Sequence, residues 1–536
     1  MLAIAVVLLV SGWLVFDTLR RPGTAPLATP TASAGAQATA TATPTDGLPG
    51  PTPTASTSGE PVLPTPSPSP SPPPLGAVDM PFVPVHSFWG TERGLSSEEL
   101  AAAVAGTGKR FATVALPADD AAAIAAALGV TLGADVMTGT VDEVRAAVRD
   151  GALGVLRLTD VTPAVRALDL DGMSLFGNHR LADLADWPLA VTIDGPPLPD
   201  QSATWTLVAG GDVMLDRSVG VQMYTNGRGV DYPWNGGTAR VTKIVCCSSF
   251  DWPIPRTERT GNGGAVRDLF GGADLTIANL ETAVRGDATP NEGGLTFVSH
   301  PDAVAAAADA GFDFFSLANN HIGNGGEKGI LGAIETLDGL GVAHAGAGRT
   351  AAEALAPALF EVNGTRVAIV ACDWIAPRYW VRADRVGSQS CRDEALLDGL
   401  RAADASADLV IVFPHWGKEY RATPRPYQRQ LAEDWLTAGA DMIIGAHVHW
   451  AAGIELNDGE LVFYSLGNLV FDQSWSAQTQ MGVILELTFR GDVPVQAWLH
   501  PTVILDQAQP NLLTADEDLR LVLDQMREGS EGLLPY

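Results

Sequence analysis

The chain of 536 residues is poor in basic side chains and in cysteine. Only 33 Lys and Arg stand against 62 Asp and Glu, and the formal net charge is −29. Because nucleic-acid binding requires clustered Lys and Arg to release counterions, this balance excludes general nucleic-acid binding. None of the four cysteines forms a C-x-x-C pair, so the sequence argues against a thiolate metal site. The apolar content of 46% excludes disorder of the whole chain.

The first 77 residues lack the pattern of a folded domain. Residues 2–16 form an uncharged apolar run that is long enough to span a bilayer at the short limit. No small-x-small cleavage site follows closely, which favours a membrane anchor over residues 1–21, with a cleaved signal segment as the alternative. Arg20 and Arg21 follow the run, against the positive-inside rule. Residues 22–77 are rich in Pro, Thr and Ser and predict an extended, disordered stalk.

This arrangement predicts a single-pass membrane protein whose folded domains are extracytoplasmic. In such a compartment a Cys372–Cys391 disulfide is expected, although four cysteines allow three pairings and free buried thiols are the alternative.

Residues 78–200 predict a small α/β domain of unknown role. Short apolar strands alternate with Ala-rich helical segments, and Ser96 with Glu99 forms a capping box that opens one helix. The triplet 177–179 (GNH) resembles a phosphatase fragment, but no strand precedes it and its companion motifs are missing. We therefore assign it no function.

Residues 203–508 predict a second α/β domain in which apolar strands end in polar clusters. Because ligands of α/β sheets bind at the carboxyl ends of strands, these clusters predict one site. The clusters are Gly211-Asp212, Asn279-Leu280-Glu281, Asn319-Asn320-His321, His415-Trp416-Gly417 and His447-Val448-His449. Hairpin turns are expected at 363–364 and 457–459. Residues 509–536 predict a helical tail, with an amphipathic acidic helix over 515–529 that is either docked or solvated.

The clustered side chains have the chemistry of metal ligands. Four of the nine histidines follow strongly apolar strands, together with two carboxylates. Carboxylate, imidazole and amide oxygen ligands suit Mn²⁺, Fe²⁺ or Zn²⁺. Two divalent ions at about 3.5–4 Å would need one shared carboxylate and could promote an in-line phosphoryl displacement.

Six ordered motifs carry a resemblance to a known family. GDVML, ADLTIANLE, SLANNH, HWGKEY, GAHVH and YSLGNLVFDQ, within about residues 206–475, closely resemble the CapA/PgsA-type capsule-synthesis proteins of the calcineurin-like metallophosphatase superfamily. The resemblance implies a four-layer α-β-β-α metallophosphatase sandwich and a role in capsule or poly-γ-glutamate synthesis or export at a bacterial cell membrane.

The resemblance also implies residue roles. Asp212, Glu281 and His449 would hold one metal ion, and Glu281 would bridge to a second. Asn320, His415 and His447 would complete the second site. His321 would act as general acid or charge stabiliser. Asn319, Glu419 and Asn468 would support the ligands or face the substrate.

Two positions depart from the motifs of the resembled proteins. Met214 stands where the superfamily has a metal-binding His, and a thioether is a poor ligand for hard divalent ions. Asn324 stands where the family usually has Asp, which removes a charge. Residues 226–264, with Cys246 and Cys247, form an apparent insertion beside the first motif.

The leading functional hypothesis is therefore a membrane-anchored, extracytoplasmic metalloprotein of capsule or poly-γ-glutamate synthesis or export, with dimetal hydrolase chemistry. Its expected partners are a cell-envelope anionic polymer or phosphoester substrate, the membrane, and capsule ligase or export proteins. The alternatives are a general secreted metal-dependent phosphoesterase and a non-catalytic scaffold stabilised by metal.

Overall fold

The computed structural model of the chain describes residues 76–261, 263–291 and 293–536, which belong to one compact unit, Pro72–Tyr536. The predicted anchor or signal segment (1–21) and all but the last two residues of the predicted stalk (22–77) lie outside the described residues. Gly76 and Ala77 already belong to the first strand. Among the described residues, no helix has both the length and the apolar character needed to cross a membrane.

The region predicted as a small α/β domain contains its own sheet, with the order β4-β3-β5-β1-β6 and with β8 also paired to β1. Its strands are β1 (Gly76–Ser87), β3 (Val114–Pro117), β4 (Met137–Gly139), β5 (Leu153–Arg157), β6 (Val165–Ala167) and β8 (Ala190–Gly195). Its helices are α1 (Ser97–Val104), α2 (Ala121–Ala127) and α3 (Val141–Arg149). The capping box at Ser96 is present, because both of its reciprocal hydrogen bonds form. The buried core of this region consists of residues between 80 and 189 together with Val495.

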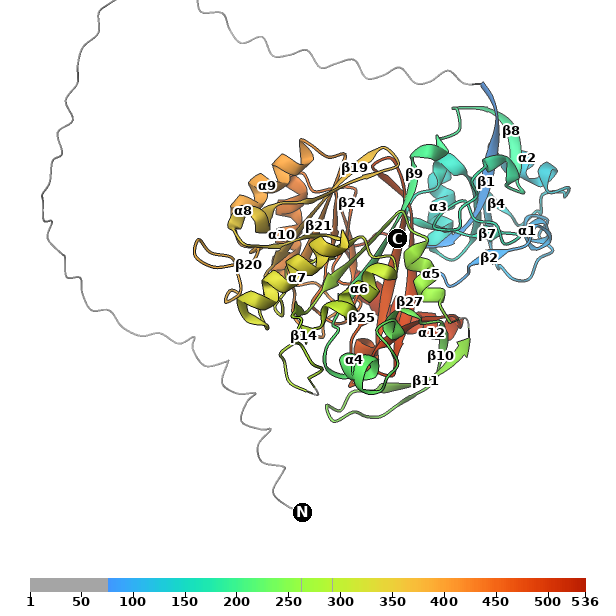
Figure 1. Cartoon of the computed structure of the whole chain (residues 1–536). Coiled ribbons are helices and arrows are strands. Elements are labelled where there is room, and N and C mark those ends of the chain that lie inside the picture. Colours follow the sequence, from blue (N-terminus) through green and yellow to red (C-terminus); the bar gives the residue numbers. More distant parts are fainter. Residues whose placement is uncertain (1–75, 262, 292) are drawn as a thin grey trace, which may run out of the picture. The chain divides into compact units, whose positions relative to one another are not determined.

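Two larger sheets, accompanied by helices and short two-stranded sheets, make up most of the rest of the unit (Figure 1). The ten-stranded sheet has the order β11-β10-β28-β27-β26-β9-β12-β15-β16, with β25 also paired to β9. Its strands are β9 (Thr204–Val213), β10 (Thr238–Val245), β11 (Ile254–Gly261), β12 (Leu275–Leu280), β15 (Phe314–Ser316), β16 (Ala343–Ala345), β25 (Asn468–Val470), β26 (Met481–Arg490), β27 (Val493–Leu505) and β28 (Gln509–Leu513).

The six-stranded sheet has the order β18-β19-β21-β22-β24-β23. Its strands are β18 (Ala358–Val362), β19 (Thr365–Asp373), β21 (Leu409–His415), β22 (Met442–Ile444), β23 (Ile454–Asn457) and β24 (Glu460–Phe463). Both expected hairpins are confirmed, since β18 pairs antiparallel with β19 across 363–364 and β23 with β24 across 458–459. Asn363 and Asp458 take the positive φ that such tight turns require.

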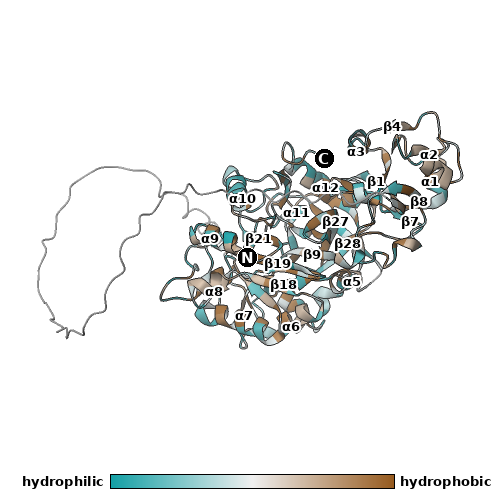
Figure 2. Cartoon of the chain, turned by 90° about the horizontal axis from the view of Figure 1, so that it is seen from above, coloured by the Kyte–Doolittle hydropathy of each residue, from teal (hydrophilic) through white to brown (hydrophobic). Residues whose placement is uncertain are grey.

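Alternating side chains of each strand pack into different layers. Leu207 of β9 and Ile369 of β19 share one core between the two sheets, whereas Val208 packs against helices on the outer face of the ten-stranded sheet. Those helices are α5 (Ala265–Gly271), α6 (Pro301–Asp309) and α7 (Gly326–Leu340). Helices α9 (Ala395–Asp404) and α10 (Pro426–Thr437) cover the six-stranded sheet. Figure 2 shows apolar and polar residues mixed along these helices, as expected when one face is buried.

The C-terminal segment is docked rather than solvated. Residues 509–513 form β28, which pairs with β27 and β10, so the sheet continues beyond the predicted boundary at 508. Helix α12 (Asp516–Gly529) follows, and its Leu519, Val522 and Met526 are buried in the core between the sheets. The apolar face of the predicted amphipathic helix is therefore part of the fold.

The GNH triplet at 177–179 lies where the small sheet region meets the larger sheet. The backbone N–H of Asn178 donates to Glu486 Oε1 at 2.7 Å, and its side-chain amide donates to the carbonyl of Leu269 at 2.6 Å. Gln496 of β27 makes similar contacts, because its side chain bonds the backbone of Val165 and Ala167. The triplet therefore has a structural role, because it links its own region to β26 and α5 of the larger sheet region.

Two disulfides are present. Cys372 and Cys391, whose Cα atoms lie 4.9 Å apart, form the expected bond, and the adjacent Cys246 and Cys247 form the other. Asp373, the last residue of β19, follows Cys372 and is fully buried. Its carboxylate accepts hydrogen bonds from the backbone of Ile375 and from Ser388, and burial raises its pKa to about 6.

We expect Asp373→Asn to change how stability depends on pH. In acid the wild-type carboxyl is neutral in both the folded and the unfolded chain. Because burial raises its pKa in the fold, the carboxyl ionises first in the unfolded chain as the pH rises. The folded state therefore loses stability until the pH has passed about 6. The free energy of unfolding of the variant, relative to wild type, should rise by about 3 kcal/mol between acid and neutral pH. Denaturant titrations at both pH values measure this difference. A constant difference would contradict the buried, protonatable carboxyl.

Candidate metal centre

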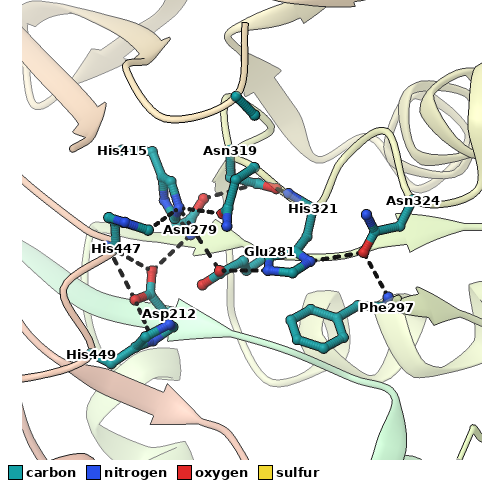
Figure 3. Close-up of polar contacts among 12 residues, drawn as sticks. Asp212, Asn279, Glu281, Phe297, Asn319, His321, Asn324, His415, His447 and His449 are labelled. Atoms are coloured by element: carbon teal, nitrogen blue, oxygen red, sulfur yellow. Dashed lines mark hydrogen bonds and ion pairs between the residues drawn. The ribbon is translucent and has the colours of Figure 1, made fainter. Parts of the chain in front are cut away.

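Six side chains from five strand ends converge at the carboxyl edges of the two sheets (Figure 3). Asp212 lies near the end of β9, and Glu281 follows β12 directly. His415 ends β21, and the loop after β22 carries His447 and His449. Asn320 lies in the loop after β15. Each of these polar residues follows a run of apolar residues that forms a buried strand. They therefore lie at the carboxyl ends of the strands, where ligands of α/β sheets bind.

The ligand atoms form two clusters that share Glu281. Asp212, Glu281 and His449 make up the first, and Glu281, His415 and His447 make up the second, each with ligand atoms within 4.8 Å of one another. Asn320 joins the second cluster, because its Oδ1 lies 2.8 Å from His415 Nε2. The structure therefore brings together all six residues expected as ligands, with Glu281 in the bridging position.

The Glu281 carboxylate fits a bridging metal ligand. It is completely buried, and neither of its oxygens has a hydrogen-bond partner within the described part of the chain. Burial and the neighbouring charge of Asp212 raise its pKa well above the usual value. Buried carboxylates are normally paired, so two unpaired oxygens next to Asp212 are best explained by cation binding.

The imidazoles are also suited to ligation. Burial, followed by the proximity of other histidines, lowers the pKa values of His415 and His447 well below the usual value, which keeps both rings neutral. His449 differs, because burial is outweighed by its hydrogen bond and attraction to Asp212, which raise its pKa. Neutral imidazole is the form that binds metal ions.

The backbone around the centre is strained. His447 and His449 take φ values of 95° and 60°, which are uncommon for residues with side chains. Such outliers persist where surrounding contacts hold them and they cluster at functional sites. A steric constraint also requires glycine at position 211, because a Cβ there would lie 1.9 Å from the carbonyl oxygen of Gly467. That close approach allows the Asp212 N–H to donate to the same carbonyl.

His321 lies beside the two clusters without joining either. Its Nε2 is 3.7 Å from Glu281 Oε1, and its Nδ1 is 2.8 Å from Asn324 Oδ1. Asn324 Oδ1 also accepts the backbone N–H of Phe297, which identifies this atom as the oxygen and makes His321 Nδ1 the donor. Burial lowers the pKa of His321 to about 4, so its Nε2 holds a lone pair toward the centre (Figure 3).

The remaining predicted residues take supporting or peripheral positions. Asn319 is buried and binds the backbone of Leu280 and His321, which fixes the loop. Asn468 is buried behind His449, and its Oδ1 accepts a hydrogen bond from His449 Nδ1 at 2.9 Å. Glu419 is exposed, and its charge contributes to the raised pKa of Glu281. Asn319 and Asn468 therefore lie in the interior beside the expected ligands, whereas Glu419 lies at the surface.

Met214 occupies the position at which the superfamily has a histidine ligand. Its side chain is completely buried in the core beneath the outer helices, and its sulfur accepts the backbone N–H of Asp216 at 3.1 Å. The first cluster therefore depends on Asp212, Glu281 and His449.

Replacing Asn468 with alanine should weaken the first cluster selectively. A hydrogen bond to the second ring nitrogen of a metal-binding histidine, such as that from His449 to Asn468, orients the imidazole. Loss of such a bond typically lowers metal affinity by about 10- to 100-fold. Calorimetric titration of Mn²⁺ should show the weakening at one of two sites. Asn511→Ala removes an equally buried asparagine that binds the backbone of Gly237, and should leave both affinities unchanged. Equal weakening of both sites by Asn468→Ala would contradict this role.

The sequence analysis placed Asn279 in a predicted cluster without giving it a role, and it missed Phe297 and Arg217. Asn279 donates to Asp212 Oδ1 at 2.8 Å and lies 3.2 Å from His415 Nδ1. A polar residue inside the buried strand 275–280 was the available signal. Phe297 stacks on His321 with centroids 3.8 Å apart, and Arg217 lies over Phe297 at 4.7 Å. No local pattern marks these two, because Phe297 lies in a loop and Arg217 begins the short helix α4 (Arg217–Gly220).

Comparisons with known proteins agree with this geometry. Residues 206–473 match the family described as "Bacterial capsule synthesis protein PGA_cap". "Capsule biosynthesis protein CapA" of Bacillus anthracis is 32% identical over 239 residues, which cover 44% of this chain and 58% of that protein. "PGA biosynthesis protein CapA" of Bacillus subtilis (strain 168) is 29% identical over 215 residues, 39% of this chain and 57% of that protein.

A "Probable polyglutamine synthesis accessory protein" of Mycobacterium tuberculosis (strain ATCC 25618 / H37Rv) is 30% identical over 296 residues. The alignment covers 50% of this chain and 74% of that protein. The chain therefore spans somewhat more than half the length of the two Bacillus relatives and about three quarters of the mycobacterial one.

Proposed function

The chain belongs to the family of bacterial capsule synthesis proteins described as PGA_cap, and from this premise we propose that it is a metal-dependent hydrolase of cell-envelope polymer synthesis. Its polymer is proposed to be a capsule of the poly-γ-glutamate type, because the similar proteins are named for capsule, PGA or polyglutamine synthesis. The proposed fold is the four-layer metallophosphatase sandwich, which the two sheets and their outer helices support.

One observation carries the proposed chemistry, namely the sharing of Glu281 by two ligand clusters. Two divalent ions held there would supply Lewis-acid stabilisation of the charge that develops on a transferred phosphoryl group. Asp212, Glu281 and His449 would hold one ion, and Glu281, Asn320, His415 and His447 the other. Mn, Fe and Zn all suit this combination of oxygen and nitrogen ligands.

His321 is proposed to move a proton at the centre. Its Nδ1–H is held by Asn324, so its Nε2 is the atom that accepts a proton from a nucleophile or returns one to a leaving group. Phe297 covers one face of the ring and fixes its orientation. Burial is the main cause of the lowered pKa of His321, and the hydrogen bond to the Asn324 amide opposes it only in part.

The proposed location is outside the cytoplasm, with the N-terminal apolar run as a membrane anchor. The two disulfides are in keeping with an oxidising compartment. The proposed partners are a cell-envelope anionic polymer or phosphoester substrate, and membrane proteins for capsule ligation or export.

The test is metal analysis of the purified full chain together with an activity screen over phosphoesters and γ-glutamyl polymers. We expect two divalent ions per chain and hydrolysis of an aryl phosphate that His415→Ala abolishes. A metal-loaded chain that is inert toward every phosphoester and γ-glutamyl polymer would overturn the proposed hydrolase. Capsule formation that survives His321→Ala would then favour a metal-stabilised scaffold.

A further inference from the structure

A cluster of aromatic side chains lies on the edge of the metal centre, and we name it the aromatic rim. It consists of Phe250 and Trp252 from the hairpin tip between β10 and β11, Tyr420 after β21, Trp450 after His449, and Trp475 after β25. Ring centroids of Trp252 lie 5.3 Å from Tyr420 and 6.0 Å from Trp450. Tyr420 stacks toward the ligand His449 at 6.2 Å. The rim therefore begins at the metal centre itself.

The rim is not a buried core. Phe250 is 62% exposed, and the other four rings are half-buried. Large apolar side chains gathered at the surface beside a polar site are typical of ligand-binding surfaces. Two of the five rings come from the segment 226–264, which the sequence marks as an insertion beside the first motif.

A groove continues from the rim along helix α12. Trp450 lines a hollow of about 750 Å³ together with Arg421, Arg520 and Gln525. A second hollow of about 220 Å³, lined by Ile244 and Pro253 of the same hairpin, shares Gln478, Leu521 and Gln525 with the first. Because they share these residues, the two hollows lie next to each other along α12, and together, as the groove, they offer an extended surface that suits a chain molecule better than a compact ligand.

The charges of the groove argue against a polyanion. Arg421 and Arg520 face three acids, Glu517, Asp524 and Glu528, and the exposed Glu419 lies next to Tyr420 on the rim. A polymer with a carboxylate on every unit would meet net repulsion here. Side chains of both signs, together with Gln478 and Gln525, instead offer many donors and acceptors to an uncharged, polyhydroxylated ligand.

We infer that the aromatic rim and the groove along α12 bind a saccharide chain. Sugar rings present an apolar C–H face that stacks on aromatic rings and a hydroxyl edge that hydrogen-bonds to carboxylates, amides and guanidinium groups. Binding requires no metal. The inference rests on the proposed function only in that a phosphoester carried by the saccharide would lie at the metal centre, next to Tyr420.

Full-length protein tests this inference against an array of neutral and phosphorylated oligosaccharides, including β-1,4-linked N-acetylglucosamine and glucose oligomers, with a γ-glutamyl oligomer alongside. Tryptophan fluorescence and calorimetry report binding. We expect at least one neutral oligosaccharide to bind, and Phe250→Ala to weaken it by about tenfold, the effect of losing one aromatic anchor. Because Phe250 is exposed, this variant should fold; Arg520→Ala provides an independent probe of the groove.

Two controls separate this inference from the proposed function. Leu359→Ala truncates a similarly exposed side chain, 66% accessible on β18, and should leave saccharide binding unchanged. Glu281→Gln should bind the same oligosaccharide as wild type although it lacks the bridging carboxylate. Failure of every oligosaccharide to bind overturns the inference, as does binding that neither Phe250→Ala nor Arg520→Ala weakens. Preferential binding of the γ-glutamyl oligomer at these residues also overturns it.

Discussion

Replacing Glu281 with glutamine is expected to abolish tight binding of both metal ions. Glu281 is the member common to both ligand clusters, and an amide cannot offer two anionic oxygens. Loss of a supporting contact alone lowers metal affinity by about 10- to 100-fold, so losing the bridge should cost more than about 100-fold at each site. Elemental analysis and calorimetric titration with Mn²⁺ measure this, and phosphoester hydrolysis should fall with occupancy.

The same substitution should leave the metal-free protein at least as stable as wild type. Burial raises the pKa of Glu281, so ionising it in the fold costs free energy that a glutamine avoids. Glu486→Gln is the matched control, because Glu486 is also a buried glutamate but is paired with His500 at 2.6 Å. The control should keep both ions and lose stability. A Glu281→Gln variant that retains both ions, or unfolds without them, would contradict the bridging role.

His321→Ala is expected to lower kcat while both metal ions remain bound. His321 lies outside the two clusters, and its Nε2 faces Glu281 at 3.7 Å. Removing a positioned proton-transfer group typically costs between about 10²- and 10⁴-fold in rate. Steady-state kinetics on an aryl phosphate, with metal content measured on the same sample, separate rate from occupancy.

His344→Ala is the matched control for this prediction. His344 lies in β16, the strand that follows α7. Its Nε2 is 3.1 Å from Asp338 Oδ1, and it belongs to neither ligand cluster. Its removal should change neither kcat nor metal content. If His321→Ala loses metal, His321 is a ligand instead; if its kcat is unchanged, His321 moves no proton in the rate-limiting step.

Strand ends explain why so much of the metal centre could be predicted. Asp212, Glu281, His415, His447 and His449 each follow a run of apolar residues, and such runs are buried strands whose ends meet along one edge. Capping at Ser96 and the hairpin at 363–364 were also predictable, because both depend on residues only a few positions apart.

Other features depend on contacts between distant segments. The sequence predicts an acidic amphipathic helix at the C-terminus but does not say what it packs against. In the structure its Val522 and Met526 are part of the core between the sheets. Phe297 reaches His321 from a loop that carries no recognisable motif, and Arg217, at the start of the short helix α4 (Arg217–Gly220), lies over Phe297. Local sequence cannot supply such contacts, because they are determined by how whole elements pack.

The sequence by itself determined the family through its ordered motifs, and the resemblance to that family predicted the six ligand residues. Periodicity and strand-end chemistry, which are local properties, predicted the two α/β regions and the position of the site. Only the tertiary structure decided that Glu281 stands between the two clusters with both oxygens unpaired, and that His321 presents Nε2 to them. The tertiary structure alone also joined Trp252, Tyr420 and Trp450 beside His449. These juxtapositions arise where loops from separate strands converge, and their geometry is set by the packing of the sheets that carry them.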